Sequence, residues 1–114
     1  RAAQESRGLG DVYKGQPQRR LEIARCMITR PRVLMLDEPA AGLNPQEKID
    51  LQGLIERLRQ EYGVSVLLIE HDMSLVLGVS ERILVMEYGK PIALGTPDTV
   101  RNDPRVIKAY LGEE

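Results

Sequence analysis

The stretch Val33-Leu34-Met35-Leu36-Asp37-Glu38-Pro39 decides the fold of this chain. Four apolar residues run without a break into two adjacent carboxylates, and Pro31 and Pro39 bound the run. A short continuous apolar run of this kind predicts a strand that is buried on both faces of a parallel sheet. Asp37 and Glu38 are then expected at the carboxyl end of that strand, where open α/β sheets place their ligands.

The acid pair has two interpretations. Unpaired buried charge is costly, so two acids at the edge of an apolar core are poor packing residues. Their natural use is to hold a metal ion beside a proton acceptor, as in nucleotide hydrolysis. The alternative is a strand end that turns into a solvated loop.

Composition describes a globular chain and excludes several classes of function. The 114 residues carry a net charge of −1 and a pI of about 5.9, so bulk charge gives no reason to expect nucleic acid or anionic lipid as a partner. Cys26 is the only cysteine, which excludes an internal disulfide, and we expect it in the core. No apolar run approaches the roughly 20 residues of a membrane span, and the N-terminus lacks the apolar region of a signal peptide. These features predict a cytosolic compartment.

A strand–helix–strand unit is predicted around the acid pair. Asn44-Pro45-Gln46-Glu47 is a strong helix start, with a cap, a proline in the first turn and a possible capping box. Gly63 is placed to close the helix, and Val64–Ile69 forms the second strand. The two strands should be parallel, so Glu70-His71-Asp72 leaves the second strand at the same edge as the acids. The helix should bury Leu51, Leu54, Ile55, Leu58 and Tyr62.

The remaining elements flank this unit. A helix is expected from Pro17 to Arg30, with an apolar stripe of Leu21, Ile23, Ala24, Met27 and Ile28. Asp72 can cap a short helix through Val79 that turns Met73, Val76 and Leu77 inward. Residues 82–86 and 91–94 read as a hairpin. Helix starts follow at Thr96-Pro97 and Asp103-Pro104, and the last helix should bury Val106, Ile107, Tyr110 and Leu111.

The order of these parts resembles the C-terminal half of the ATPase domain of ABC transporters, from Gln18 to Glu114. Val33–Glu38 is similar to the Walker B motif with its catalytic glutamate, Ala41–Asn44 to the D-loop, and His71 to the switch histidine. Four longer stretches resemble the branched-chain amino-acid (leucine/isoleucine/valine) type: Arg19–Arg25, Glu38–Pro45, Ile69–Met73 and Ala109–Gly112.

The resemblance implies roles for individual residues. Asp37 would bind Mg²⁺, through water because Mg²⁺ keeps several waters. Glu38 would orient and deprotonate the attacking water, and His71 would hydrogen-bond the γ-phosphate of ATP. Gly42 and Asn44 would lie at the seam of a dimer and contribute to nucleotide binding; the alternative is that they are a turn and a helix cap.

The segment before the first helix departs from the family. The signature motif would place Gly15 and Gln16 at the nucleotide, but Tyr13 or Lys14 stands where the family has a serine. No Gly-x-x-x-x-Gly-Lys-Ser/Thr occurs in the chain. We therefore expect residues 1–16 to be an irregular or non-native segment, and residues 17–114 to be the C-terminal part of an ABC ATPase domain whose Walker A half is missing.

The expected fold class is α/β, a partial P-loop NTPase domain with a parallel sheet core, a C-terminal hairpin and helices. The expected function is that of the ATP-binding and hydrolysing subunit of a branched-chain amino-acid importer, using ATP and Mg²⁺ at the cytoplasmic face of the inner (plasma) membrane. Its partners would be a second ATPase subunit, arranged head to tail, and transmembrane permease subunits, with no nucleic acid. The alternatives are an inactive fragment that serves as an interaction module, and an ABC-type ATPase without a transport role.

Overall fold

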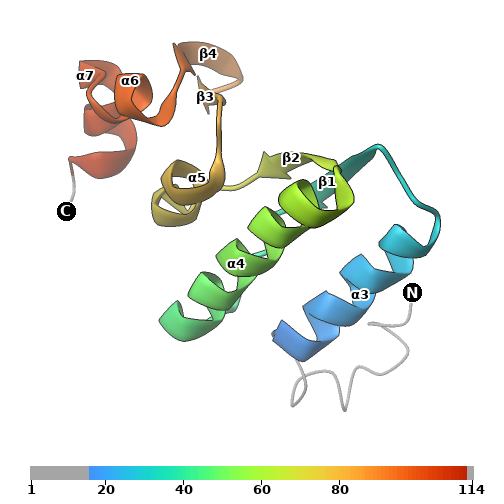
Figure 1. Cartoon of the computed structure of the whole chain (residues 1–114). Coiled ribbons are helices and arrows are strands. Elements are labelled where there is room, and N and C mark those ends of the chain that lie inside the picture. The colour runs from blue at the N-terminus through green and yellow to red at the C-terminus, as the bar shows by residue number, and fades with distance from the viewer. Residues whose placement is uncertain (1–15, 113–114) are drawn as a thin grey trace. The chain divides into compact units, whose positions relative to one another are not determined.

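The computed structural model describes residues 16–112 (Figure 1). They form two compact units, the first ending at Ile69 and the second beginning at Glu70. The expected irregular segment 1–16 lies outside the described residues except for Gln16, the first residue of α3. The first unit contains α3 (Gln16–Ile28), β1 (Val33–Asp37), α4 (Pro45–Tyr62) and β2 (Ser65–Ile69). The second contains α5 (Met73–Val79), β3 (Ile83–Glu87), β4 (Lys90–Gly95), α6 (Pro97–Arg101), α7 (Pro104–Val106) and the π-helical turn η1 (Ile107–Leu111).

The strand–helix–strand unit is present as the sequence predicts. β1 and β2 are parallel, in a register that runs from Val33 opposite Ser65 to Asp37 opposite Ile69. α4 connects the two strands and lies along them (Figure 1). The expected α/β class with a parallel sheet is therefore confirmed.

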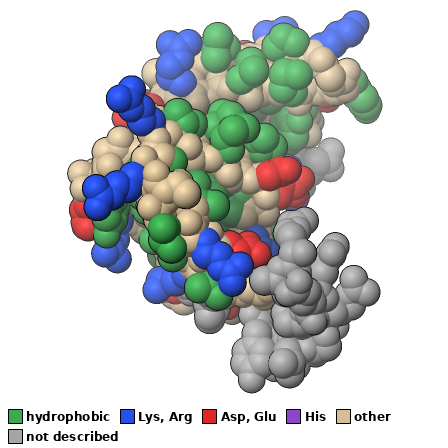
Figure 2. Space-filling view, turned by 90° about the vertical axis from the view of Figure 1, so that its right-hand side faces the viewer, with side chains coloured by type: hydrophobic (Ala, Val, Ile, Leu, Met, Phe, Trp, Pro, Cys, Tyr) green, Lys and Arg blue, Asp and Glu red, His purple; other side chains and the backbone are tan. Residues whose placement is uncertain are grey.

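The sheet is buried on one face only, so the prediction that β1 is covered on both faces is wrong for this chain. Leu34 and Leu36 are buried, whereas Met35 is 66% exposed and its neighbour across the sheet, Leu67, is 51% exposed. Side chains alternate between the faces of a strand, and among the described residues nothing covers the second face. Figure 2, a view of one side of the molecule, shows hydrophobic side chains at the surface among charged ones.

The ends of α4 follow the predicted capping chemistry. The side chain of Asn44 accepts a hydrogen bond from the Glu47 amide at 2.8 Å, and the Glu47 carboxylate accepts one from the Asn44 amide at 2.9 Å. Pro45 occupies the first turn. Gly63 ends the helix with φ +66° and donates its amide to the carbonyl of Leu58. Local side-chain and backbone chemistry therefore sets both boundaries.

The inward face of α4 is narrower than predicted. Leu51, Ile55 and Leu58 are buried and Leu54 is half-buried, as expected. Tyr62 is 63% exposed and is a correction to the predicted core. It occupies the last position of the helix, where the chain turns away toward Gly63.

Helix α3 also buries less than its sequence predicts. Ile23 is buried and Met27 is half-buried, and these two residues are four positions apart on one stripe. Leu21, Ala24 and Ile28, on the neighbouring stripe, are exposed. Cys26 is exposed as well, so its expected place in the core is wrong. Since only one stripe of this helix is covered within the described residues, the other apolar side chains remain at the surface.

The second unit begins with α5, which Asp72 caps as predicted. The Asp72 carboxylate accepts a hydrogen bond from the Leu75 amide at 3.2 Å. Val76 is buried, and Met73 and Leu77 are half-buried. Leu75 and Val79, which were not predicted to face inward, are buried too.

The predicted hairpin is formed by antiparallel β3 and β4. Tyr88 and Gly89 make the two-residue connection, with φ +51° and +76°. Positive φ at both positions is typical of the type I′ turn that joins twisted strands.

Both predicted proline-led helix starts are present after the hairpin. Thr96 caps α6 and Asp103 caps α7, each through its side-chain oxygen. Val100 and Val106 are fully buried and belong to the core of this unit, together with the buried side chains of α5 and with Ile83 and Val85 of β3. Ile107, which was expected to be buried, is exposed, while Tyr110 and Leu111 are half-buried. The type of helix changes at this point, because α7 ends at Val106 and the π-helical turn η1 begins at Ile107. The wider turn shifts the directions of the side chains from those that a regular α-helix would give.

Candidate functional site

The acid pair lies at the carboxyl end of β1. Asp37 is the last residue of the strand, and Glu38 is the first residue beyond it. The Glu38 amide still donates to the carbonyl of Ile69 at 2.7 Å, so the end of β2 holds the backbone at this point. Glu38 has φ +48°, a left-handed conformation that is uncommon for a residue with a side chain. Such conformations persist where surrounding structure imposes them, and they cluster at functional sites.

The chain continues from Glu38 in two overlapping turns. The Ala41 amide donates to the Glu38 carbonyl at 3.2 Å, and the Leu43 amide donates to the Ala40 carbonyl at 3.1 Å. Gly42 is the third residue of the second turn and has φ +80°. A Cβ atom there would meet nothing within 4 Å, so backbone conformation alone explains the glycine. Pro39, Ala40 and Leu43 are buried, whereas Ala41 and Gly42 are exposed.

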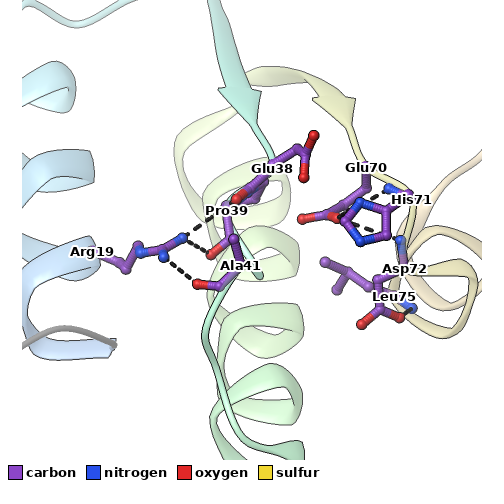
Figure 3. Close-up of polar contacts among 8 residues, drawn as sticks. All are labelled: Arg19, Glu38, Pro39, Ala41, Glu70, His71, Asp72 and Leu75. Atoms are coloured by element: carbon purple, nitrogen blue, oxygen red, sulfur yellow. Dashed lines mark hydrogen bonds and ion pairs between the residues drawn. The ribbon is translucent and has the colours of Figure 1, made fainter.

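Arg19 of α3 reaches this loop (Figure 3). Its Nη1 atom donates a hydrogen bond to the carbonyl of Pro39, and its Nη2 atom donates one to the carbonyl of Ala41. A longer contact of 3.4 Å joins Nη1 to the carbonyl of Glu38. Sequence reasoning did not assign this role. Arg19 stands next to Arg20 on a helix rich in arginine, and no local pattern tells which one contacts the loop.

Asn44 ends the loop and begins α4. Its side chain is engaged in the capping box with Glu47. The structural alternative for this residue, a helix cap, is therefore observed. A contribution to nucleotide binding stays a prediction.

Glu70, His71 and Asp72 follow β2 and open the second unit. One carboxylate oxygen of Glu70 accepts hydrogen bonds from the amides of His71, at 3.1 Å, and Asp72, at 3.4 Å (Figure 3). The same oxygen lies 3.9 Å from Nδ1 of His71, whose side chain is 74% exposed. Glu70 thus fixes the backbone from which the imidazole projects. The sequence placed Glu70 in the Glu70-His71-Asp72 stretch without a role of its own. No rule of residue spacing predicts the hydrogen bonds from the amides of His71 and Asp72 to its carboxylate.

The residues present suit part of a Mg²⁺-nucleotide site. Asp37 and Glu38 are both exposed, so their oxygens can contact a hydrated Mg²⁺, which prefers carboxylates and water. Gly15 lies outside the described residues. Gln16 begins α3, but its side chain is not among those described. Among the described residues, 16–112, no helix combines the length and the hydropathy needed to cross a membrane.

Comparison with known proteins gives consistent matches. Residues 90–114 match the model of a family described as "Branched-chain amino acid ATP-binding cassette transporter". The chain is 63% identical over 108 residues to the high-affinity branched-chain amino acid transport ATP-binding protein BraF of Pseudomonas aeruginosa, covering 95% of this chain and 42% of BraF. It is 62% identical over 96 residues to LivG of Escherichia coli K12, which carries the same description, covering 84% of this chain and 38% of LivG.

A solved structure shares the fold. The ADP conformation of MJ1267, an ATP-binding cassette of an ABC transporter, superimposes with a TM-score of 0.76 at 30% identity, covering 97% of this chain and 48% of that one. The chain therefore spans less than half the length of these proteins.

Proposed function

Because this chain belongs to the branched-chain amino-acid ATP-binding cassette transporter family, we propose that it is part of an ATP-hydrolysing subunit that powers import of branched-chain amino acids. The observation that carries the proposal is the placement of Asp37 and Glu38. Asp37 is the last residue of the parallel strand β1 and Glu38 follows it, so the two adjacent carboxylates lie at the carboxyl end of the strand, and both residues are exposed.

The chemistry follows from the two acids. When bound, Mg²⁺ would neutralise charge at the phosphates, and Asp37 would hold the ion through water. Glu38 orients a water molecule and accepts its proton as the water oxygen bonds to the terminal phosphorus. The bond from that phosphorus to the bridging oxygen of ADP breaks, which gives ADP and inorganic phosphate. His71 donates a hydrogen bond to the terminal phosphate, and its exposed ring supports this role.

The partners belong to the same proposal. A second ATPase subunit closes head to tail on this one, with Gly42 and Asn44 at the seam beside the nucleotide and Gly15 and Gln16 contributing from the signature segment. Closure of the two ATPase subunits moves transmembrane permease subunits, which they contact at the cytoplasmic face of the inner membrane. The descriptions of BraF and LivG as transport ATP-binding proteins support this assignment.

The experiment uses a longer protein, because the chain spans less than half of BraF. We define the BraF chimera as P. aeruginosa BraF in which residues 17–112 of this chain replace the matching part. Phosphate release with Mg-ATP, and uptake of labelled leucine after assembly with the BraF permease subunits, should both be retained. A chimera that folds and assembles but neither hydrolyses ATP nor supports uptake would contradict the proposal.

A further inference from the structure

The loop that begins at Glu38 presents four successive carbonyls, and each has a donor. The carbonyls of Glu38 and Ala40 accept hydrogen bonds from amides of the loop itself. The carbonyls of Pro39 and Ala41 accept them from Arg19. The loop and one arginine side chain therefore share these carbonyls as donors: Arg19, which lies on a different element, α3, binds those of Pro39 and Ala41 and makes the longer contact with that of Glu38 (Figure 3).

The guanidinium group suits this task. Its Nη1 and Nη2 atoms lie in one rigid plane and bind two different carbonyls. A lysine ammonium would place a single centre of donors there, without the fork. Arg19 also lies on the inward stripe of α3, four and eight positions before Ile23 and Met27. The buried side of the helix thus aims the guanidinium at the loop.

Glu38 is the residue whose backbone conformation depends most on this contact. Its backbone is left-handed, at φ +48°, and is held on one side by the bond from its amide to Ile69. On its other side the next carbonyl, that of Pro39, is bound by Arg19. The Glu38 side chain itself is exposed, so the backbone determines where its carboxylate starts.

We propose that Arg19 is a positioning residue for ATP hydrolysis, which fixes the loop that carries Glu38; this inference rests on the proposed function. Arg19 does not touch the reacting atoms. It acts by restricting the loop to the backbone conformation in which the Glu38 carboxylate faces the attacking water. Small misplacements of a catalytic group lower the rate strongly.

The test compares Arg19→Gln and Arg19→Lys in the BraF chimera. The matched control is Arg25→Gln, which removes an exposed arginine from the same helix. We expect Arg19→Gln to lower kcat for Mg-ATP by about 10- to 100-fold, with KM changed by less than about twofold because ground-state binding is kept. Arg19→Lys should retain an intermediate kcat, and Arg25→Gln should match the parent.

Hydrogen exchange provides a readout besides activity. The amides of Ala41 and Leu43, which donate within the loop, should exchange faster in Arg19→Gln than in the parent, while the amides of β1 keep their protection. If Arg19 were merely structural, kcat per folded subunit would stay at the parent value and protection would fall throughout the first unit. That result would overturn the inference.

The two proposals fail in different ways. If the parent chimera hydrolyses ATP, Glu38→Gln abolishes hydrolysis and Arg19→Gln behaves as the parent, the inference is wrong and the proposed function stands. If the parent chimera folds and assembles but neither hydrolyses ATP nor supports uptake, the proposed function is wrong, and the role of Arg19 in hydrolysis is wrong with it.

Discussion

Asp37, the last residue of β1, lies directly opposite Ile69, the last residue of β2. The following amide, that of Glu38, donates to the carbonyl of Ile69 at 2.7 Å. The two parallel strands therefore end at the same level, and the chain leaves both of them at one edge of the sheet. The residues with candidate chemistry follow these two ends in the sequence, Glu38 after β1 and His71 after β2.

The two acids should respond differently to removal of their charge. Glu38→Gln in the BraF chimera keeps the length of the side chain and its carbonyl oxygen but loses its basicity, so hydrolysis should fall by about 10²- to 10⁴-fold. ATP should remain bound and hold the subunits as a dimer. Asp37→Asn should weaken Mg²⁺ binding and, with it, nucleotide binding. Phosphate release and size-exclusion chromatography with ATP distinguish the two variants. Near-parental hydrolysis by Glu38→Gln would show that Glu38 is not the base.

His71→Ala should reduce hydrolysis without destabilising the fold. The imidazole is 74% exposed, so its loss should change the free energy of unfolding by no more than about 0.5 kcal/mol. Loss of a donor to the developing phosphate charge should lower kcat by about 10²- to 10³-fold. Ser74→Ala, an exposed change on the following helix, serves as the control. Steady-state kinetics and urea unfolding measure both quantities, and an unchanged kcat would leave His71 without a catalytic role.

Asn44 can be tested for its two roles with two substitutions. Asn44→Ala removes the acceptor for the Glu47 amide and should lower the free energy of unfolding of the BraF chimera by about 1 kcal/mol. Asn44→Asp keeps an acceptor oxygen and should be near the parent in stability. If Asn44 also lies at the nucleotide seam, Asn44→Asp should weaken ATP-dependent dimer formation because it adds negative charge beside the phosphates. Parental dimerisation of Asn44→Asp would reduce Asn44 to a helix cap.

Two glycines should respond to alanine with opposite signs. Gly42 has φ +80°, so Gly42→Ala should destabilise the fold by about 1–2 kcal/mol through backbone strain alone, since a Cβ there would meet no neighbour within 4 Å. Gly53 lies within α4, and a Cβ there also meets nothing within 4 Å. Gly53→Ala should stabilise the fold by about 0.5–1 kcal/mol. Urea unfolding of both variants measures the difference, and equal signs would contradict the assigned conformation of the loop.

The 114-residue chain alone should not bind ATP tightly. No Gly-x-x-x-x-Gly-Lys-Ser/Thr occurs in it, and that loop supplies the backbone amides that cradle the phosphates. Isothermal titration with Mg-ATP should show no binding at micromolar nucleotide, whereas the BraF chimera should bind. A micromolar dissociation constant for the chain alone would show that another group of donors binds the phosphates.

The sequence by itself determined the elements whose boundaries depend on neighbouring residues. The start of α4 follows from Asn44, Pro45 and Glu47, because each supplies or omits a hydrogen bond within one turn. The hairpin also depends on neighbouring residues, because two short apolar runs flank a turn that contains Gly89, a residue that accepts positive φ. The placement of Asp37 and Glu38 at a strand end was predicted as well, since an apolar run that stops at two acids fixes where the strand stops.

Only the tertiary structure decided which surfaces are covered and which distant groups meet. Met35 and Cys26 are exposed although their sequence context is apolar, because burial depends on what packs against an element and not on its own pattern. The contact from Arg19 to the carbonyls of Pro39 and Ala41 joins residues that are 20 and 22 positions apart. Such a contact depends on the packing of α3 beside the loop, and no periodicity along the chain encodes that packing.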